Sequence, residues 1–207
     1  MVSDNVNGDE VLRRAYNATL RALTVSGALT EGAVKIGTVS GVAKTISVTK
    51  AIEAKGDYAA EDVLSSATAT GSATPWTFSA IFRANGTGGY ITKAVIKSES
   101  TASLAFRPTM YLYNVTPTGA MGDNEANTNP TYADQAKFVG QIDWPAFSDL
   151  GGMSTSIATP STPGNLPLWV DAATAADDLF GILVTRDAEA NETAGDYFIV
   201  ELTLEQY

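Results

Sequence analysis

Cysteine and histidine are both absent from the 207 residues of this chain. Their absence excludes disulfides, thiol nucleophiles, zinc sites built from Cys and His, and catalytic triads that use imidazole as the base. Because most routes to enzymatic chemistry are closed, we expect a protein that is not an enzyme, with no catalytic residues, no metal site and no cofactor. Its stability must come from packing, hydrogen bonding or assembly, since covalent cross-links are missing.

Basic residues are few: the chain has 13 Lys and Arg against 23 Asp and Glu, a net charge of −10, and no basic run. We expect no nucleic-acid partner, because nothing here would neutralise a row of phosphates. The imbalance is uneven, since residues 1–56 hold 7 basic and 5 acidic side chains, whereas residues 57–207 hold 6 and 18. This difference suggests that the N-terminal part meets a different neighbour, although ordinary solubility explains the charge equally well.

Long apolar runs are missing as well. No window reaches the roughly 18 to 20 apolar residues of a membrane-spanning helix. The opening "MVSDNVNGDE" has neither the charged start nor the apolar core of a signal peptide. We therefore expect no membrane partner, and synthesis in the cytoplasm without secretion by the signal-peptide route.

The N-terminal region has the pattern first of a helix and then of a strand. In "EVLRRAYNATLRALTVSG", residues 10–27, a narrow apolar stripe recurs at helical spacing and gives way to alternation from Leu23. Residues 34–48 are small, β-branched and punctuated by glycine, so they can pair as a strand but bury little area alone. We predict an N-terminal arm over residues 1–56, made of a short helix plus extended strands. The alternative is that residues 34–48 form edge strands of the body.

From residue 57 onward the chain has the pattern of an all-β protein, with short apolar or alternating runs between clusters of Gly, Pro, Asn, Asp and Ser. Roughly eight or nine strands in about 150 residues fit a two-sheet sandwich of the jelly-roll type. The predicted fold is therefore all-β: a jelly-roll-like β-sandwich body over residues 57–207, with an extended N-terminal arm that contains a short helix.

Some strands of this body can be described in more detail. A hairpin is predicted around Asn85-Gly86, because this pair supplies the positive φ of a tight turn. The strand over residues 91–97 has no clear inward phase. Pro108 is predicted at a bulge or a sheet edge, because proline cannot donate to a β-ladder.

Two other runs alternate clearly. Met110 and Leu112 are predicted on one face of a strand, opposite Tyr111 and Tyr113. The last strand ends close to the C-terminus, and we expect it to be integral to a sheet. Its apolar phase consists of Phe198, Val200, Leu202 and Leu204.

The polar loop over residues 118–135 is a candidate cation site. It collects oxygen donors of the kind that hard cations prefer, namely Asp123, Asn124, Glu125, Asn127, Asn129 and Asp134. Their spacing does not match an EF-hand loop. Because the same residue types build turns, we favour a turn-rich surface connection over a calcium site.

Other candidate sites have simple structural explanations. Adjacent residues of a strand point to opposite sides, so Asp177 and Asp178 are expected in a solvated turn rather than in acid–base catalysis. No histidine is present to activate the closely spaced serines, which are Ser65, Ser66, Ser154 and Ser156. Aromatic residues could line a carbohydrate platform, but in a β-sandwich they more often pack in the core or against loops. These are Trp76, Trp144, Trp169, Tyr111 and Tyr113.

The sequence resembles tailed-bacteriophage virion proteins in four motifs. A segment of the form "xVLxxVYDxxxNxLRV" opens many of them, head decoration proteins and fibres among them, and it is matched here by Val11, Leu12, Tyr16, Leu20, Leu23 and Val25. Asn17 stands where that pattern has aspartate. The body resembles a family of phage structural proteins in "YAxxDV", "DNxA…DxxKxxG" and "LxGxLVxR". Those motifs fall on Tyr58, Ala59, Asp62 and Val63, on Asp123, Asn124, Ala126, Asp134, Lys137 and Gly140, and on Leu179, Gly181, Leu183, Val184 and Arg186.

This resemblance implies a virion structural protein, a head decoration (cement) protein whose β-sandwich sits on the capsid exterior while the arm binds the major capsid protein. The implied location is the virion, after synthesis in the host cytoplasm. We also expect a symmetric homo-oligomer, with a trimer favoured over a dimer. The expected arm contacts are Leu12, Tyr16, Leu20, Leu23 and Val25.

Two alternatives stay open. A tail or head fibre, acting as a receptor-binding module, would attach through the arm and recognise host-surface glycans with the sandwich. An enzyme that cleaves polysaccharides would need paired carboxylates at a readable spacing, which the sequence does not offer.

Overall fold

Strands with inward apolar side chains are the main regular elements of the described chain, as the alternation in the sequence predicts. The structure is a computed structural model that describes residues 42–53, 56–67, 71–99, 103–160, 165–191 and 193–206. The helix predicted in the arm lies outside these residues.

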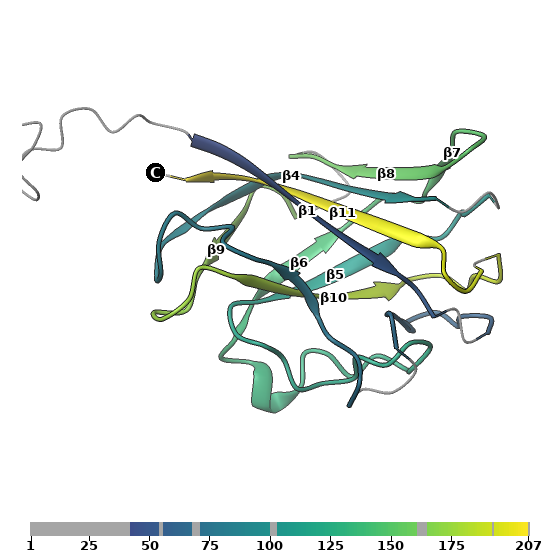
Figure 1. Ribbon diagram of the computed structural model, residues 1–207, viewed down its shortest axis with the longest axis horizontal. Helices are drawn as coiled ribbons and strands as arrows, with labels where there is room; N and C mark the ends of the chain where they lie inside the picture. The colour runs from purple at the N-terminus through teal and green to yellow at the C-terminus, as the bar shows by residue number, and fades with distance from the viewer. Residues whose placement is uncertain are drawn as a thin grey trace, which may run out of the picture. The chain divides into compact units, whose positions relative to one another are not determined.

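The strands form two antiparallel sheets (Figure 1). The six-stranded sheet has the order β1-β11-β4-β8-β7, with β9 also paired to β4. Its strands are β1 (Val42–Ala51), β4 (Gly88–Ser98), β7 (Ser148–Asp149), β8 (Ser154–Ala158), β9 (Leu168–Asp171) and β11 (Tyr197–Gln206).

The five-stranded sheet has the order β2-β10-β5-β6, with β3 also paired to β10. Its strands are β2 (Val63–Leu64), β3 (Trp76–Phe78), β5 (Pro108–Tyr113), β6 (Phe138–Asp143) and β10 (Leu179–Thr185). A 3-10 helix, η1 (Tyr132–Asp134), is the only helical element within the described ranges.

The strand pairs are nested along the chain. The first strand, β1, pairs with the last, β11; β2 and β3 pair with β10; β4 pairs with β8 and β9; and β5 pairs with β6. This nesting divides the strands between two sheets in the pattern of a jelly roll, with two Greek keys folded over each other. The predicted fold class, a jelly-roll β-sandwich, is confirmed.

The main core lies between the two sheets. The apolar phase predicted for the last strand is confirmed, because all four of its residues are fully buried in this core. Trp76 and Trp144 are among its largest buried side chains, and Trp144 Nε1 donates to the Ala94 carbonyl oxygen across the sandwich at 3.1 Å. Met110 and Leu112 face this core, as predicted, while Tyr111 and Tyr113 lie on the outer side of the five-stranded sheet.

A β-bulge explains why the strand at 91–97 had no clear inward phase. Lys93 pairs with Thr203 and Ile91 pairs with Leu204, so Thr92 is an extra residue in the ladder. Ile91 points inward on one side of this bulge, and Ala94, Ile96 and Ser98 point inward on the other. A single inserted residue reverses the phase, and no simple alternation spans the strand.

The predicted hairpin around Asn85-Gly86 is wrong. β3 pairs with β10 and β4 pairs with β11, so residues 79–87 cross from one sheet to the other. Gly86 does have the predicted positive φ, at 68°, and its N–H donates to the carbonyl oxygens of Ala173 and Ala176. The turn chemistry was correct, but the partner of each strand lies far away in the sequence.

Pro108 lies neither at a bulge nor on an edge strand. It is the first residue of β5, which lies between β10 and β6. The first position of a strand tolerates proline because the missing N–H need not join the ladder. The Pro108 carbonyl oxygen still accepts a hydrogen bond from the Trp144 N–H at 3.0 Å.

The sandwich begins earlier than the predicted boundary at residue 56. β1 pairs with β11 from Val42↔Gln206 to Ala51↔Tyr197, and Ile46 and Val48 pack against the core. The alternative that the 34–48 segment forms an edge strand is therefore confirmed for residues 42–48. Small residues that bury little area alone are stabilised here by a continuous ladder with β11. The chain from residue 42 onward has 9 basic and 19 acidic residues, so the whole net charge of −10 belongs to it.

Two lysines of β1 point inward at this sheet edge. Lys50 Nζ donates to both oxygens of Thr74, at 3.0 Å to the hydroxyl, and lies 5.7 Å from the centre of the Trp76 ring. Lys44 Nζ donates to the Ala80 carbonyl oxygen. Inward-pointing charges on an edge strand disfavour pairing with a strand of another chain. The long edge of β1 is thereby protected.

The half-buried position of Lys50 predicts a pH-dependent stability. Burial lowers the pKa of Lys50 from 10.5 to about 8. Between these two values the unfolded chain holds a proton that the folded chain has lost, so the contribution of Lys50 to the unfolding free energy rises with pH across that window. We expect the unfolding free energy of the wild type minus that of Lys50→Met to increase between pH 8 and pH 10.5, measured by urea denaturation.

Methionine has a similar length and does not titrate, so the subtraction cancels the other ionisable groups. A difference that is flat or decreases across this window would contradict the assignment.

Candidate interaction surface

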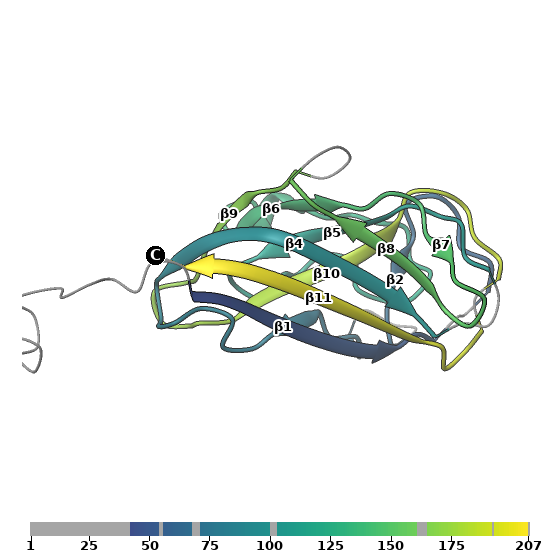
Figure 2. The ribbon, with the colours of Figure 1, turned by 90° about the horizontal axis from the view of Figure 1, so that it is seen from above.

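Figure 2 looks onto the outward side of the six-stranded sheet, with β4, β11 and β1 in front and no described segment drawn over them. We call this surface the open face. Strand register and burial assign its outward side chains to Ala43, Thr45, Ser47, Thr49 and Ala51 on β1, Tyr197, Ile199, Glu201, Thr203 and Glu205 on β11, Tyr90, Lys93, Val95 and Lys97 on β4, Thr155 and Ile157 on β8, and Trp169 and Asp171 on β9.

The open face is rich in exposed apolar side chains. Seven large hydrophobic residues are exposed in the described chain, and four of them lie here: Tyr90, Ile157, Trp169 and Tyr197. Val95, which belongs to neither buried cluster, lies directly beside Ile157 and is only 7% exposed. Clustering of exposed apolar residues on one face marks a surface that another molecule covers.

An aromatic pair occupies one end of the open face. Tyr90 and Trp169 are directly paired in the ladder, and their rings meet edge to face with centroids 5.0 Å apart. Gly88 makes room for the indole, because a Cβ there would come within 2.6 Å of the Trp169 ring. The Trp169 side chain remains 49% exposed.

Except for Asp171 on β9, the charged residues of the open face lie on its two central strands. Lys97 on β4 and Glu201 on β11 form an ion pair, with Nζ and Oε1 2.7 Å apart. Lys93 and Glu205 form no ion pair with any described residue.

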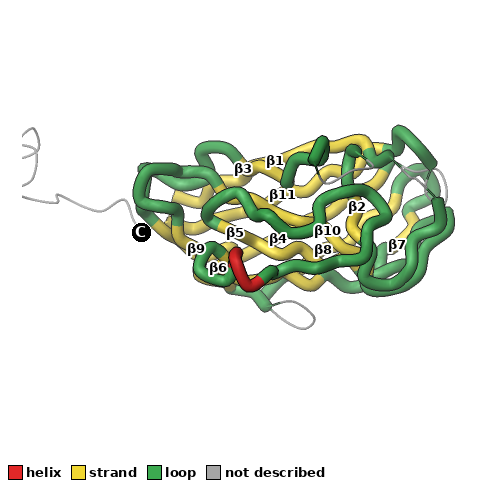
Figure 3. The backbone as a smooth tube through the Cα atoms, turned by 90° about the horizontal axis from the view of Figure 1, so that it is seen from below, coloured by secondary structure: helices red, strands yellow, loops and turns green. Residues whose placement is uncertain are grey.

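The outward side of the five-stranded sheet is covered by the chain itself (Figure 3). Loop residues Ala120 and Met121 pack there against a second buried cluster, which comprises Val63, Tyr111, Tyr113, Ile182 and Val184. The two sheets therefore differ: one outer side carries its own small core, and the other carries the open face.

The acidic loop over residues 118–135 builds this cover, and its buried carboxylates act as hydrogen-bond acceptors. Both oxygens of Asp123 accept from the Tyr58 hydroxyl, at 2.8 and 2.9 Å, and Oδ1 also accepts from the Ser65 N–H. Asn124 and Glu125 form backbone hydrogen bonds with Val63. Asp62 forms an isolated β-bridge with Ala126, and the Asp62 carbonyl oxygen accepts a hydrogen bond from the Thr185 N–H. The three sequence motifs that contain these residues therefore lie in contact.

Asp134 is the second buried carboxylate of this loop. It accepts hydrogen bonds from the Thr118 N–H and hydroxyl, the Thr131 hydroxyl and Lys137 Nζ. Burial alone would raise the pKa of Asp134, but the bonds from Lys137, Thr118 and Thr131 outweigh it and hold this pKa well below its usual range. These contacts agree with the preferred interpretation, a turn-rich connection. No group of three or more acidic residues suited to a metal ion occurs in the described ranges.

The other sequence candidates also have structural partners. Asp178 Oδ1 accepts from the Ala80 N–H at 2.7 Å, and the Asp177 carbonyl oxygen accepts from the Phe82 N–H, so this pair fastens the crossover between the sheets. The Ser154 hydroxyl accepts from the Leu104 N–H, and the Ser156 hydroxyl donates to the Pro145 carbonyl oxygen. Of the five aromatic candidates, Trp169 alone is exposed; Trp76, Trp144, Tyr111 and Tyr113 are buried.

A cleft of about 340 Å³ lies at the ends of β5, β6 and β10. In it Arg186 Nη1 donates to both Glu61 carboxylate oxygens, at 2.7 and 2.9 Å, and Nε donates to the Thr109 hydroxyl. Arg107 at its rim makes a two-point contact with Asp187. Each guanidinium already has a carboxylate partner, so an anionic ligand would have to displace one. The cleft is best explained as an ion-pair network that fastens the loops.

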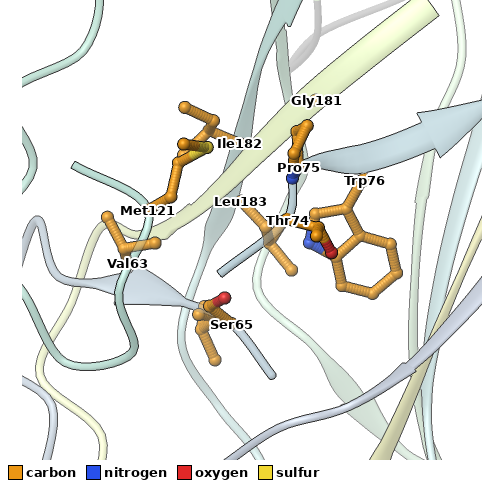
Figure 4. A pocket seen from close by; sticks show the side chains of 10 residues that line it. Val63, Ser65, Thr74, Pro75, Trp76, Met121, Gly181, Ile182 and Leu183 are labelled. Atoms are coloured by element: carbon orange, nitrogen blue, oxygen red, sulfur yellow. The ribbon is translucent and has the colours of Figure 1, made fainter. Parts of the chain in front are cut away.

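A much smaller cavity lies in the gap between β2 and β3 (Figure 4). Its volume is about 10 Å³, close to the minimum that holds one water molecule. The Ser65 hydroxyl and Trp76 Nε1 line it, and neither has a hydrogen-bond partner among the described residues. The cavity therefore has about the size of one water molecule and is too small for a larger ligand.

The arm residues predicted to bind a partner, Leu12, Tyr16, Leu20, Leu23 and Val25, lie outside the described residues. No described helix is long and apolar enough to span a membrane. Sequence reasoning missed the open face, although the outward phase of the last strand, with Tyr197 and Ile199, was a readable signal.

No protein-family model and no curated protein matches the chain. Among solved structures, it is similar to a chain of the semi-empty virus-like particle of the giant freshwater prawn Macrobrachium rosenbergii nodavirus, at 12% sequence identity. That match covers 81% of this chain and 93% of the other, with a TM-score of 0.32. A likeness this weak carries no argument about the present chain. The strand pairing defines its class: an all-β jelly-roll sandwich.

The contact between Tyr58 and Asp123 predicts a large effect on stability. Tyr58→Phe removes the hydroxyl that donates to a fully buried carboxylate, so we expect the unfolding free energy to fall by about 1.5–3 kcal/mol. Urea denaturation measures this loss. The matched control is Tyr132→Phe, because Tyr132 is 89% exposed, and its effect should stay within about 0.5 kcal/mol. Equal effects of the two changes would contradict a structural role for the Tyr58 hydroxyl.

Proposed function

We propose that this protein is a non-enzymatic virion structural protein, a capsid decoration protein that binds the outer surface of the major capsid protein shell and stabilises it. The N-terminal arm, residues 1–41 after correction of the boundary, makes the attachment. The sandwich projects from the shell. The observation that carries the proposal is the contrast between the two outer faces, one sealed by the chain's own loop and one left apolar and exposed.

The use of the acidic residues supports the same proposal. The buried carboxylates Asp123 and Asp134 and the paired Asp177 and Asp178 each hold backbone or side-chain donors in place. Groups used in this way stabilise loops rather than activate a substrate. A jelly roll is also a common fold of capsid components, although it occurs in lectins and cupins as well, so the fold alone does not assign the function.

Binding only to the assembled shell would stabilise it by mass action. At a concentration 100 times the dissociation constant, this linkage contributes about 2.7 kcal/mol per site. A decoration protein therefore needs tight attachment and no chemistry.

Deletion of residues 1–41 tests the attachment. We expect the remaining sandwich to keep its thermal unfolding midpoint, because β1 is retained whole, and to lose binding to empty shells in a co-sedimentation assay. In the full chain, Leu20→Asp should weaken binding at least tenfold, and the neighbouring Thr19→Asp, which lies off the apolar stripe, should not. Full occupancy of shells by the truncated sandwich would exclude the arm as the attachment.

One observation favours a second candidate function, a fibre or receptor-binding module. The exposed edge-to-face pair of Tyr90 and Trp169 offers an apolar ring surface of the kind that sugars pack on. If the sandwich recognises glycans through this pair, Trp169→Ala should abolish binding on a glycan array while Tyr132→Phe leaves it intact. Copy number separates the candidates: many copies per particle for decoration, few for a tail component.

A further inference from the structure

The open face is complementary to itself in the size of its side chains. Its outward residues stand in four columns, in the order β1, β11, β4 and β8 with β9, and the two-residue strand β7 lies beyond β8. The β1 column has only small side chains, which are Ala43, Thr45, Ser47, Thr49 and Ala51. The column at the opposite edge carries the bulky Ile157 and Trp169, both about half exposed.

The charges of the open face are also complementary to those of a second copy, because positive and negative side chains lie on different strands. Both outward lysines, Lys93 and Lys97, lie on β4, and the outward glutamates Glu201 and Glu205 lie on the neighbouring β11. A surface that binds its own copy across a two-fold axis must carry such matched halves.

We propose that a second copy of this chain covers the open face, in a two-fold dimer whose axis runs along the strands between β4 and β11. Rotation about this axis lays β4 of each copy over β11 of the other. It also lays the β8 and β9 column of one copy, with its large side chains, over the β1 column of the other copy, with its small side chains. Two sheets stacked about 10 Å apart with nearly aligned strands are an ordinary packing arrangement.

The strand register places specific residues opposite each other. Ala43 and Trp169 share one row across the sheet, and Ser47 and Ile157 share another. Since the rotation preserves position along the strands, Trp169 of one copy meets Ala43 of the other, and Ile157 meets Ser47. Each bulky side chain enters space left by a small one.

The same register pairs the charges that have no ion-pair partner among the described residues. Lys93 lies in the row of Thr203, between the rows of Glu201 and Glu205. In the dimer it faces the β11 column of the other copy, within reach of both glutamates. Glu205 gains a lysine partner, which it lacks among the described residues of its own chain.

Net charge and the protected edge favour this face over other contacts. The chain from residue 42 onward carries a net charge of −10, which repels a second copy from most directions. The open face has two lysines against three acidic residues, with Asp171 at its rim, and is nearly neutral. Pairing through the edge of β1 is disfavoured by the inward-pointing Lys44 and Lys50. Stacking of the two open faces avoids both penalties.

Charge reversal in the full-length chain tests the dimer. We expect sedimentation velocity to give twice the chain mass of 21.6 kDa. Lys93→Glu and Glu205→Lys should each raise the dimer dissociation constant about tenfold or more, because each places like charges face to face. An equimolar mixture of these two single variants should form heterodimers, since the carboxylate introduced at position 93 of one chain then faces the ammonium group introduced at position 205 of the other.

The control is Glu53→Lys, an exposed acidic position outside the open face, which should leave the dimer intact. A monomer at every concentration, a trimer, or single variants that fail to recover on mixing would each overturn the proposal. None of these outcomes depends on binding to a shell, so the dimer and the decoration function stand or fall separately.

Discussion

The antiparallel pairing of β1 with β11 is the constraint on which the rest of this structure depends. It joins the first described strand to the last over the full length of both, from Val42↔Gln206 to Ala51↔Tyr197, and so closes the nested set of pairs that defines the jelly roll. Because β11 also pairs with β4, it sets the register of the whole six-stranded sheet. One phase of β11 fills the core and the other phase forms the centre of the open face. The register of β11 therefore determines both which of its side chains enter the core and which ones lie on the open face.

The two outer faces differ because the connections between strands differ in length and composition. The connection between β5 and β6 is long and polar, and its buried acceptors Asp123 and Asp134 hold it down over Tyr111 and Tyr113. A buried carboxylate without donors would be costly, so the hydroxyls and N–H groups around these two acids fix the loop in place. Figure 3 shows this loop lying over the five-stranded sheet. No described segment has the corresponding position over β4 and β11, and the apolar side chains there stay exposed.

Much of the fold could be predicted from the sequence, because inward apolar phases depend on local alternation. The phase of the last strand and the opposite faces of Met110 and Tyr111 needed no knowledge of partners. Strand partners were harder: Asn85-Gly86 has the residues of a hairpin, yet its flanking strands belong to different sheets, since jelly-roll pairing is set by contacts far apart in the sequence. The bulge at Thr92 concealed the phase of β4 for a similar reason. The open face could not be predicted because it exists only once five strands with separately unremarkable outward residues are placed in one sheet.

A two-fold axis along the strands has a consequence for attachment. In the proposed dimer, rotation about this axis preserves position along the strands, so residue 42 of both copies lies at the same end of the stacked sheets. If the arm of each chain binds the shell as proposed, one dimer carries two attachment points, and the second binding event then occurs at a high effective concentration. A trimer would need a heterologous interface between different patches, whereas the matched columns of the open face are isologous. The trimer expected from the sequence stays untested, and the proposed dimer differs from it in assigning self-association to the open face, apart from the arm that is proposed to make the attachment.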